Sequence, residues 1–88
     1  MVDDWKPEKG KLVRELILED FDAAVKLVNR IAVIAGELDH HPDIRIYDYK
    51  KLRIELYSHK EKRVTEKDWE LAQRIEELLQ FNGGQVKA

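Results

Sequence analysis

The sequence contains no cysteine and only two prolines and four glycines among 88 residues. Without cysteine the chain forms no disulfide, no thiolate metal site and no thiol nucleophile. No uncharged apolar run approaches the roughly 20 residues that span a bilayer, and the first ten residues are too polar for a secretory signal. We therefore expect a cytoplasmic protein without a membrane-spanning segment.

The chain also lacks an excess of charge of one sign. Sixteen Lys and Arg against 18 Asp and Glu give a formal net charge of -2, whereas domains that bind nucleic acid are usually strongly basic. Nucleic acid is therefore not an expected partner. The 43% of hydrophobic residues suit a folded domain, and the length predicts one domain over residues 1–88. A domain of this size buries only roughly 60–65% of its unfolded surface, so oligomerisation is expected to help stabilise it.

Alternation of apolar and polar residues predicts two β-hairpins. The first joins strands at residues 2–6 and 11–18 through a turn at residues 7–10, where Gly10 supplies a positive φ. The second covers residues 43–58 and turns near residues 48–49, so that cross-strand partners sum to about 98.

Two other segments have the three-and-four spacing of amphipathic helices. The first is predicted at residues 20–38, and the second begins after Thr65 and ends at residues 82–84. Thr65 and the Asp68 carboxylate have the spacing of a capping box. Each helix has one apolar stripe, so both are expected on one face of a four-stranded antiparallel sheet. The predicted class is α+β, in the order ββαββα. The stripe expected for the first helix comprises Phe21, Ala24, Val25, Val28, Ala32, Ala35 and Leu38.

Three histidines carry the clearest chemical signal. His40 and His41 are adjacent, and His59 lies 18 positions after His41. In the predicted register, residues 40 and 41 lie opposite residues 57–59, which brings the three imidazoles to one end of the sheet. Imidazole exchanges protons near neutral pH, and a pair of rings in different protonation states suits the elimination of water. A carboxylate such as Asp39 can fix the tautomer of a neighbouring ring.

Structural interpretations of the same residues remain open. A single histidine is commonly a surface residue or a satisfied hydrogen-bonding group, and three together weaken that interpretation. Asp68 is explained by helix capping, and Tyr57 by sheet packing. A zinc site is disfavoured because adjacent residues in an extended segment point to opposite faces, so His40 and His41 do not easily share one ion.

The residues resemble a known family. Residues 38–43 (LDHHPD), followed by Tyr49, His59 and Asp68 at fixed spacings, resemble the signature of pterin-4a-carbinolamine dehydratases, and the similarity runs over about residues 5–79. The resemblance implies dehydration of 4a-hydroxytetrahydropterin to quinonoid dihydropterin, which recycles tetrahydrobiopterin after aromatic amino acid hydroxylation. It implies a small pterin substrate, no metal or organic cofactor, and assembly into homodimers or homotetramers.

The resemblance also implies roles for individual residues. His40, His41 and His59 match the family's active-site histidines. His40 and His59 are the candidate general acids for the two faces of the pterin, and His41 orients the ring or accepts a proton. The pocket is expected to contain five further residues: Asp39, Pro42, Tyr57, Ser58 and, supporting it from the helix start, Asp68.

Three departures from the family's pattern leave other interpretations open. Gly36 stands where many members carry an acidic or basic residue, Arg63-Val64 replaces a Gly-Leu pair, and the family's N-terminal helix has no counterpart. The missing charged side chain at Gly36 motivates a non-catalytic alternative, in which the same fold binds a protein, as a dimerisation cofactor, or a pterin related to the molybdenum cofactor. A small metal-binding hydrolase is a third possibility.

Overall fold

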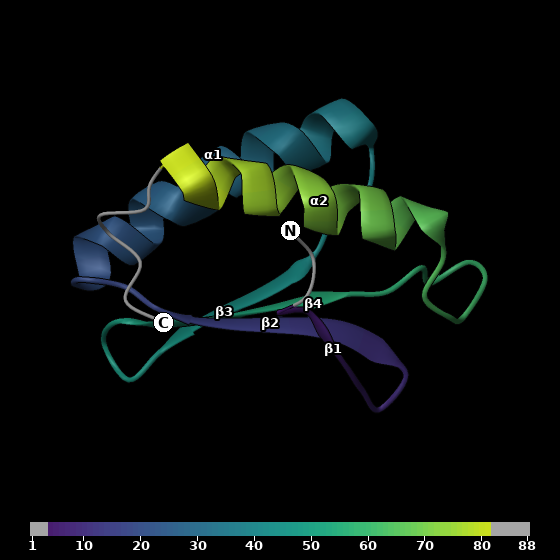
Figure 1. The fold of residues 1–88 in the computed structure, drawn as a ribbon, viewed down its shortest axis with the longest axis horizontal. Helices are drawn as coiled ribbons and strands as arrows, with labels where there is room; N and C mark the ends of the chain where they lie inside the picture. The colour runs from purple at the N-terminus through teal and green to yellow at the C-terminus, as the bar shows by residue number, and fades with distance from the viewer. Residues whose placement is uncertain (1–3, 82–88) are drawn as a thin grey trace.

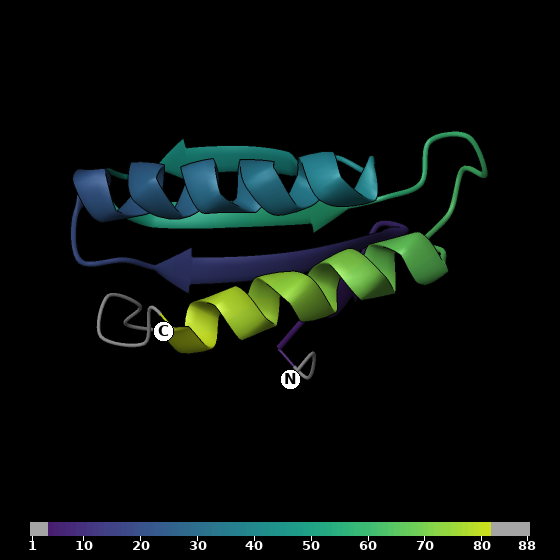
Figure 2. The same ribbon diagram turned by 90° about the horizontal axis from the view of Figure 1, so that it is seen from above.

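The computed structural model describes residues 4–81 and has two layers. Both helices cover the same face of a four-stranded antiparallel sheet, as Figure 1 shows. Figure 2 shows the helices running side by side in opposite directions across that sheet. The predicted α+β fold is therefore confirmed. The strands lie in the order β1-β2-β4-β3, and the elements are β1 (Lys6–Glu8), β2 (Lys11–Ile17), α1 (Phe21–Leu38), β3 (Asp43–Tyr47), β4 (Lys51–Leu56) and α2 (Glu66–Phe81).

The first hairpin is tighter than its sequence suggests. Glu8 pairs with Lys11, so only Lys9–Gly10 connects the strands. Both connecting residues have positive φ, 52° and 80°, as in a type I′ turn, whose twist matches that of the flanking strands. The turn predicted at residues 7–10 is therefore two residues too long. The strand predicted at residues 2–6 contributes only its last residue to β1, and its first two lie outside the described residues.

The second hairpin has the predicted register. Ile44 pairs with Ile54, and every partner pair of β3 and β4 sums to 98. The turn follows Tyr47, at residues 48–50. The ladder ends where Asp43 meets Glu55, so it does not extend to residues 57–58 as predicted. The chain instead leaves the sheet after β4 and folds back on itself.

The core lies between the helices and the inner face of the sheet. On α1, Leu27 and Ile31 are 3% and 0% exposed, whereas Phe21 is 48% exposed and Ala32 is also exposed. The stripe predicted for this helix was therefore wrong at Phe21 and Ala32. Burying the larger aliphatic side chains Leu27 and Ile31 removes more apolar surface from water than the predicted orientation would.

The apolar stripe expected on the second helix, which comprises Leu71, Ala72, Ile75, Leu78 and Leu79, faces the core. Leu78 is partly buried, and the other four are buried. Its predicted end at residues 82–84 lies outside the described residues. Neither helix in the described part of the chain is long and apolar enough to cross a bilayer.

Candidate active site

The segment that carries His40 is fixed by the way α1 ends. Asp39 has a left-handed φ of 52°, and its N–H donates to the Gly36 carbonyl at 3.3 Å. The N–H of His40 donates to the Ala35 carbonyl at 3.1 Å. These two bonds form a Schellman motif, which satisfies the last carbonyls of a helix and normally uses glycine at the left-handed position. The helix end therefore holds the backbone of His40 in one place.

The start of α2 supplies the carboxylate of the site. The side chain of Asp68, in the first turn, accepts a hydrogen bond from the Thr65 N–H at 2.9 Å. This is half of the predicted capping box. The Thr65 hydroxyl does not complete it but lies 2.6 Å from the hydroxyl of Ser58. The helix cap is therefore linked to the segment that follows β4.

Asp68 joins the two segments that the sequence places far apart. Its Oδ1 lies 2.6 Å from Nε2 of His40, and its Oδ2 accepts a hydrogen bond of 2.8 Å from Ser58. Asp68 is 0% exposed and Ser58 is 2% exposed. The end of α1, the end of β4 and the start of α2 lie at the same end of the molecule in both views (Figures 1 and 2). The carboxylate is thus shared between the two histidine-bearing segments.

His59 lies in the exposed part of this region. Its ring meets that of Tyr57 edge to face, with centroids 5.1 Å apart and an interplanar angle of 82°. The Nζ of Lys11 lies 5.9 Å from the Tyr57 ring centroid. His41 is exposed as well, while Pro42 is partly buried where the chain turns into β3. These exposed imidazoles can reach a ligand from solvent.

The predicted site residues thus fall into two groups. Ser58 and Asp68 are buried and bonded to each other, so their polar atoms support the site from below. The other six lie at the surface or partly exposed: Asp39, His40, His41, Pro42, Tyr57 and His59. Tyr49, which belongs to the family signature, lies apart from them in the turn between β3 and β4 at the other end of the hairpin. The role of the eight predicted site residues in substrate binding stays a prediction.

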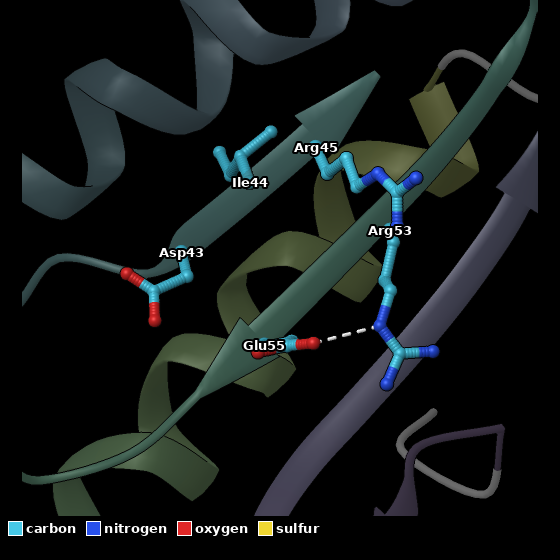
Figure 3. Close-up of a pocket in the computed structure, with 5 residues that line it drawn as sticks. All are labelled: Asp43, Ile44, Arg45, Arg53 and Glu55. Atoms are coloured by element: carbon cyan, nitrogen blue, oxygen red, sulfur yellow. Dashed lines mark hydrogen bonds and ion pairs between the residues drawn. The ribbon is translucent and has the colours of Figure 1, made fainter. Parts of the chain in front are cut away.

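The open face of the sheet carries a separate charged cluster. A hollow of about 180 Å³ is lined by Asp43, Ile44, Arg45, Arg53 and Glu55. Figure 3 shows the Arg53 guanidinium directed at the Glu55 carboxylate, with Arg45 beside it on the neighbouring strand. Arg53 also bonds Glu8 and Glu15. Because Arg53 donates to it at 2.7 Å, the pKa of Glu55 is lowered from 4.5.

This cluster is internally paired. The hydrogen bonds that Arg53 donates to Glu55, Glu8 and Glu15 raise the pKa of Arg53 above its ordinary value. An arginine that already holds three carboxylates has few free donors for a ligand. We therefore assign the cluster to the stability of the sheet.

A larger hollow, of about 500 Å³, lies between the first hairpin and the start of α2. It is lined by Pro7, Gly10, Lys11, Leu12, Val64 and Trp69. Its volume is within the range of small-ligand sites, but none of the predicted site residues lines it. Within residues 4–81, no group of three or more His, Cys, Asp or Glu side chains is arranged to hold a metal ion.

Two hydrogen bonds between side chains were not predicted from the sequence. The Thr65 hydroxyl was expected to cap its own helix, and its bond to Ser58 has no local signal. Arg14 lies on the inner face of β2 and donates to the buried Glu76 of α2 at 2.8 Å. The alternation of β2 places Arg14 on the same face as leucines, which is expected to be buried. Because a buried charge is normally paired, this position could have indicated a buried acidic partner.

Comparisons with known sequences identify relatives along most of the chain. The sequence model of the family described as "Pterin 4 alpha carbinolamine dehydratase" matches residues 1–78. A protein of Metallosphaera sedula, provisionally named pterin-4-alpha-carbinolamine dehydratase, is 40% identical over 74 residues, which cover 84% of this chain and 76% of that protein. A protein of Herpetosiphon aurantiacus with the same name is 42% identical over 75 residues, covering 85% and 77%.

Two solved structures share the fold. The crystal structure of a transcriptional coactivator/pterin dehydratase from Brucella melitensis superposes with a TM-score of 0.76 at 29% identity, covering 84% of this chain and 80% of that one. A pterin dehydratase-like protein described as a RuBisCO assembly factor in the alpha-carboxysome superposes with a TM-score of 0.69 at 18% identity, covering 85% and 88%. At 18% identity the second likeness concerns the fold alone.

Proposed function

The chain belongs to the pterin-4a-carbinolamine dehydratase family, and we propose that it converts a 4a-hydroxytetrahydropterin to quinonoid dihydropterin and water. The observation that carries the proposal is the Asp68 carboxylate shared by His40 and Ser58. Through it, the two segments that bear the three histidines meet at one end of the sheet. Relatives about 40% identical carry the corresponding name.

The reaction needs one proton donor and one proton acceptor. A general acid protonates the hydroxyl on C4a, the C–O bond breaks and water leaves. A general base removes the proton from N5, and the C4a–N5 double bond forms. The two proton transfers balance, so no redox cofactor is consumed. Positioned acid and base groups typically contribute about 10²–10⁴ in rate, which suits a labile carbinolamine.

The histidines divide these tasks in our proposal. His40 and His59 act as the acids for the two faces of the pterin, and His41 orients the ring or accepts the N5 proton. The exposure of His41 and His59 supports direct contact with a ligand. Asp39, Pro42 and Tyr57 form the wall of the pocket, while Ser58 and Asp68 act from beneath it.

A stopped-flow absorbance assay with freshly generated 4a-hydroxytetrahydropterin tests the activity. We expect the protein to accelerate the loss of the carbinolamine over the spontaneous reaction, and His41→Ala and His59→Ala each to reduce that acceleration. Lys60→Ala, at an exposed position beside His59, is the matched control and should leave the rate unchanged. Equal rates in buffer and in protein solution would overturn the proposal.

A non-catalytic binding module is the second candidate. It is favoured by Gly36, which offers no side chain where the resemblance implies a charged one, and whose surroundings are open within 4 Å. This candidate predicts that titration calorimetry detects the binding of dihydropterin or of one stable protein partner, while the stopped-flow assay shows no acceleration of the dehydration. Acceleration that depends on His41 and His59 would exclude it.

We also propose that the protein assembles into a homodimer or homotetramer, because so small a domain buries a limited fraction of its surface. An exposed Val33, 63% accessible on α1, and Trp69, 45% accessible on α2, support the proposal. Light scattering coupled to size exclusion measures the mass directly. A mass of 10.4 kDa at micromolar concentration would contradict it.

A further inference from the structure

We propose that Asp68 is a positioning residue that fixes the tautomer of His40, so that Nδ1 is the ring atom that exchanges a proton with the substrate. The inference rests on the proposed dehydratase function for its catalytic meaning. Its structural part, the position of the hydrogen on the His40 ring, follows from the hydrogen bonds around Asp68. It replaces the sequence-based expectation that Asp39 orients a neighbouring ring.

The direction of each bond follows from what a carboxylate can do. A carboxylate only accepts hydrogen bonds. The Asp68 Oδ2 accepts from the Ser58 hydroxyl at 2.8 Å and from the Thr65 N–H at 2.9 Å. Its Oδ1 lies 2.6 Å from His40 Nε2, so this nitrogen must carry the hydrogen. Nε2 keeps that hydrogen whether the ring is neutral or charged, and only Nδ1 gains or loses one.

The hydroxyl groups behind Asp68 are fixed as well. Ser58 gives its one hydrogen to Asp68, so its Oγ accepts from the Thr65 hydroxyl across 2.6 Å. Ser58 and Asp68 are almost completely buried. Among the described residues, every buried side-chain nitrogen and oxygen has a hydrogen-bond partner. The network therefore has one arrangement of hydrogens, and that arrangement leaves the His40 side with an acceptor.

The backbone restrains the same ring from its other end. The His40 N–H is bound to the Ala35 carbonyl in the Schellman motif that closes α1. Its side chain is 15% exposed, so part of it remains accessible. A ring held at its backbone and at Nε2 presents Nδ1 to a ligand at constant geometry, which general acid–base catalysis requires.

Replacing Asp68 by asparagine should reverse the tautomer. Two donors, the Ser58 hydroxyl and the Thr65 N–H, converge on the position of Oδ2, so the amide oxygen of the introduced side chain is expected to lie there. Its NH₂ group then faces His40 Nε2, which must become the acceptor. The hydrogen moves to Nδ1, and the ring presents the wrong group to the substrate.

The test is ¹⁵N NMR of the histidine rings in the full-length protein at about pH 8.5, where ordinary imidazole is neutral. We expect the Nε2–H form of His40 in the wild type and the Nδ1–H form in Asp68→Asn. Glu76→Gln is the matched control, since it removes another buried carboxylate of α2 that bonds Trp5 and Arg14 instead. This control should leave the His40 tautomer unchanged.

Kinetics provide the second readout. Asp68→Asn should lower kcat by about 10²–10⁴-fold with little change in KM, and Glu76→Gln should change neither. An Nδ1–H tautomer in the wild type would overturn the inference even if Asp68→Asn did not fold, and so would an Nε2–H form that persists in a folded Asp68→Asn. An inactive wild type with the Nε2–H tautomer would instead overturn the proposed function and leave the positioning of His40 intact.

Discussion

Trp5 and Glu76 lie 71 positions apart and are joined by a buried hydrogen bond of 2.9 Å from the indole N–H to the carboxylate. The same carboxylate oxygen accepts from Arg14 at 2.8 Å. Glu76 thereby ties the segment before β1, the inner face of β2 and the helix α2 together. Removing one member of a buried ion pair of this kind strongly lowers the free energy of unfolding, whereas replacing both members by apolar groups changes it little.

We therefore predict strong coupling between Arg14 and Glu76. Arg14→Leu alone should lower the free energy of unfolding by about 3–5 kcal/mol, because it leaves the carboxylate buried without its cation. The double variant Arg14→Leu/Glu76→Leu should recover most of that loss. Urea denaturation of the wild type, both single variants and the double variant completes the cycle. Additive losses in the double variant would contradict the prediction.

Acid should weaken the open face of the sheet. The Arg53 hydrogen bond lowers the pKa of Glu55 below its ordinary 4.5, so this group binds fewer protons in the folded state than in the unfolded one. Its contribution to stability is fully present above pH 4.5 and is lost as the pH falls through the lowered folded value. Glu55→Gln should flatten the fall in unfolding free energy below that pH, measured by denaturation at several pH values.

The matched control is Glu55→Gln in a variant that lacks the Arg53 side chain. In an Arg53→Leu background the pKa of Glu55 loses its main cause of depression, so adding Glu55→Gln should hardly change the acid dependence. An equal effect of Glu55→Gln in both backgrounds would count against the assignment.

The orientation of α1 gives a third prediction. Ile31→Ala should cost about 2–5 kcal/mol, because Ile31 is 0% exposed and its removal leaves a cavity. Phe21→Ala should cost below about 1 kcal/mol, because nearly half of that side chain is exposed. Thermal and chemical denaturation of the two variants compare them directly. A larger loss for Phe21→Ala would restore the helix face that the sequence pattern suggested.

Asp39 allows backbone strain and function to be separated. Its φ of 52° suits glycine better than any other residue, with a penalty of about 1 kcal/mol for a side chain there. Asp39→Gly should therefore fold with unchanged or slightly raised stability. If its carboxylate lines the pterin pocket, as proposed, the same variant should show a lower kcat/KM. Full activity in Asp39→Gly would remove Asp39 from the pocket.

A charged side chain added at Gly36 tests whether the charge that the resemblance implies at this position contributes to activity. Gly36 lies in the last turn of α1, where no basic residue is present and where an added Cβ meets no atom within 4 Å. Gly36→Lys should raise stability by about 1 kcal/mol through helix propensity and the helix dipole, and should raise the dehydration rate. Val33→Lys, exposed on the same helix, is the control for added charge alone. Equal rates in both variants would exclude a specific role for position 36.

Much of the architecture is readable from the chain because it depends on local periodicity. The alternation around Ile44 and Ile54 predicted their pairing, and the Thr65–Asp68 spacing predicted the start of α2. The first turn was less readable because Pro7 resembles a turn residue, yet β1 lies at the edge of the sheet, where proline is tolerated in a strand.

The partners of the side-chain hydrogen bonds, in contrast, depend on the tertiary structure. The sequence determined that three histidines and an aspartate occur at spacings that the fold can bring together, since strand register and helix caps follow from neighbouring residues. Only the tertiary structure decided that Asp68, rather than Asp39, holds His40, and that Ser58 joins Thr65 in donating a hydrogen bond to Asp68. Such bonds join residues as far as 28 positions apart, and which of them form depends on how the helices rotate when they pack on the sheet.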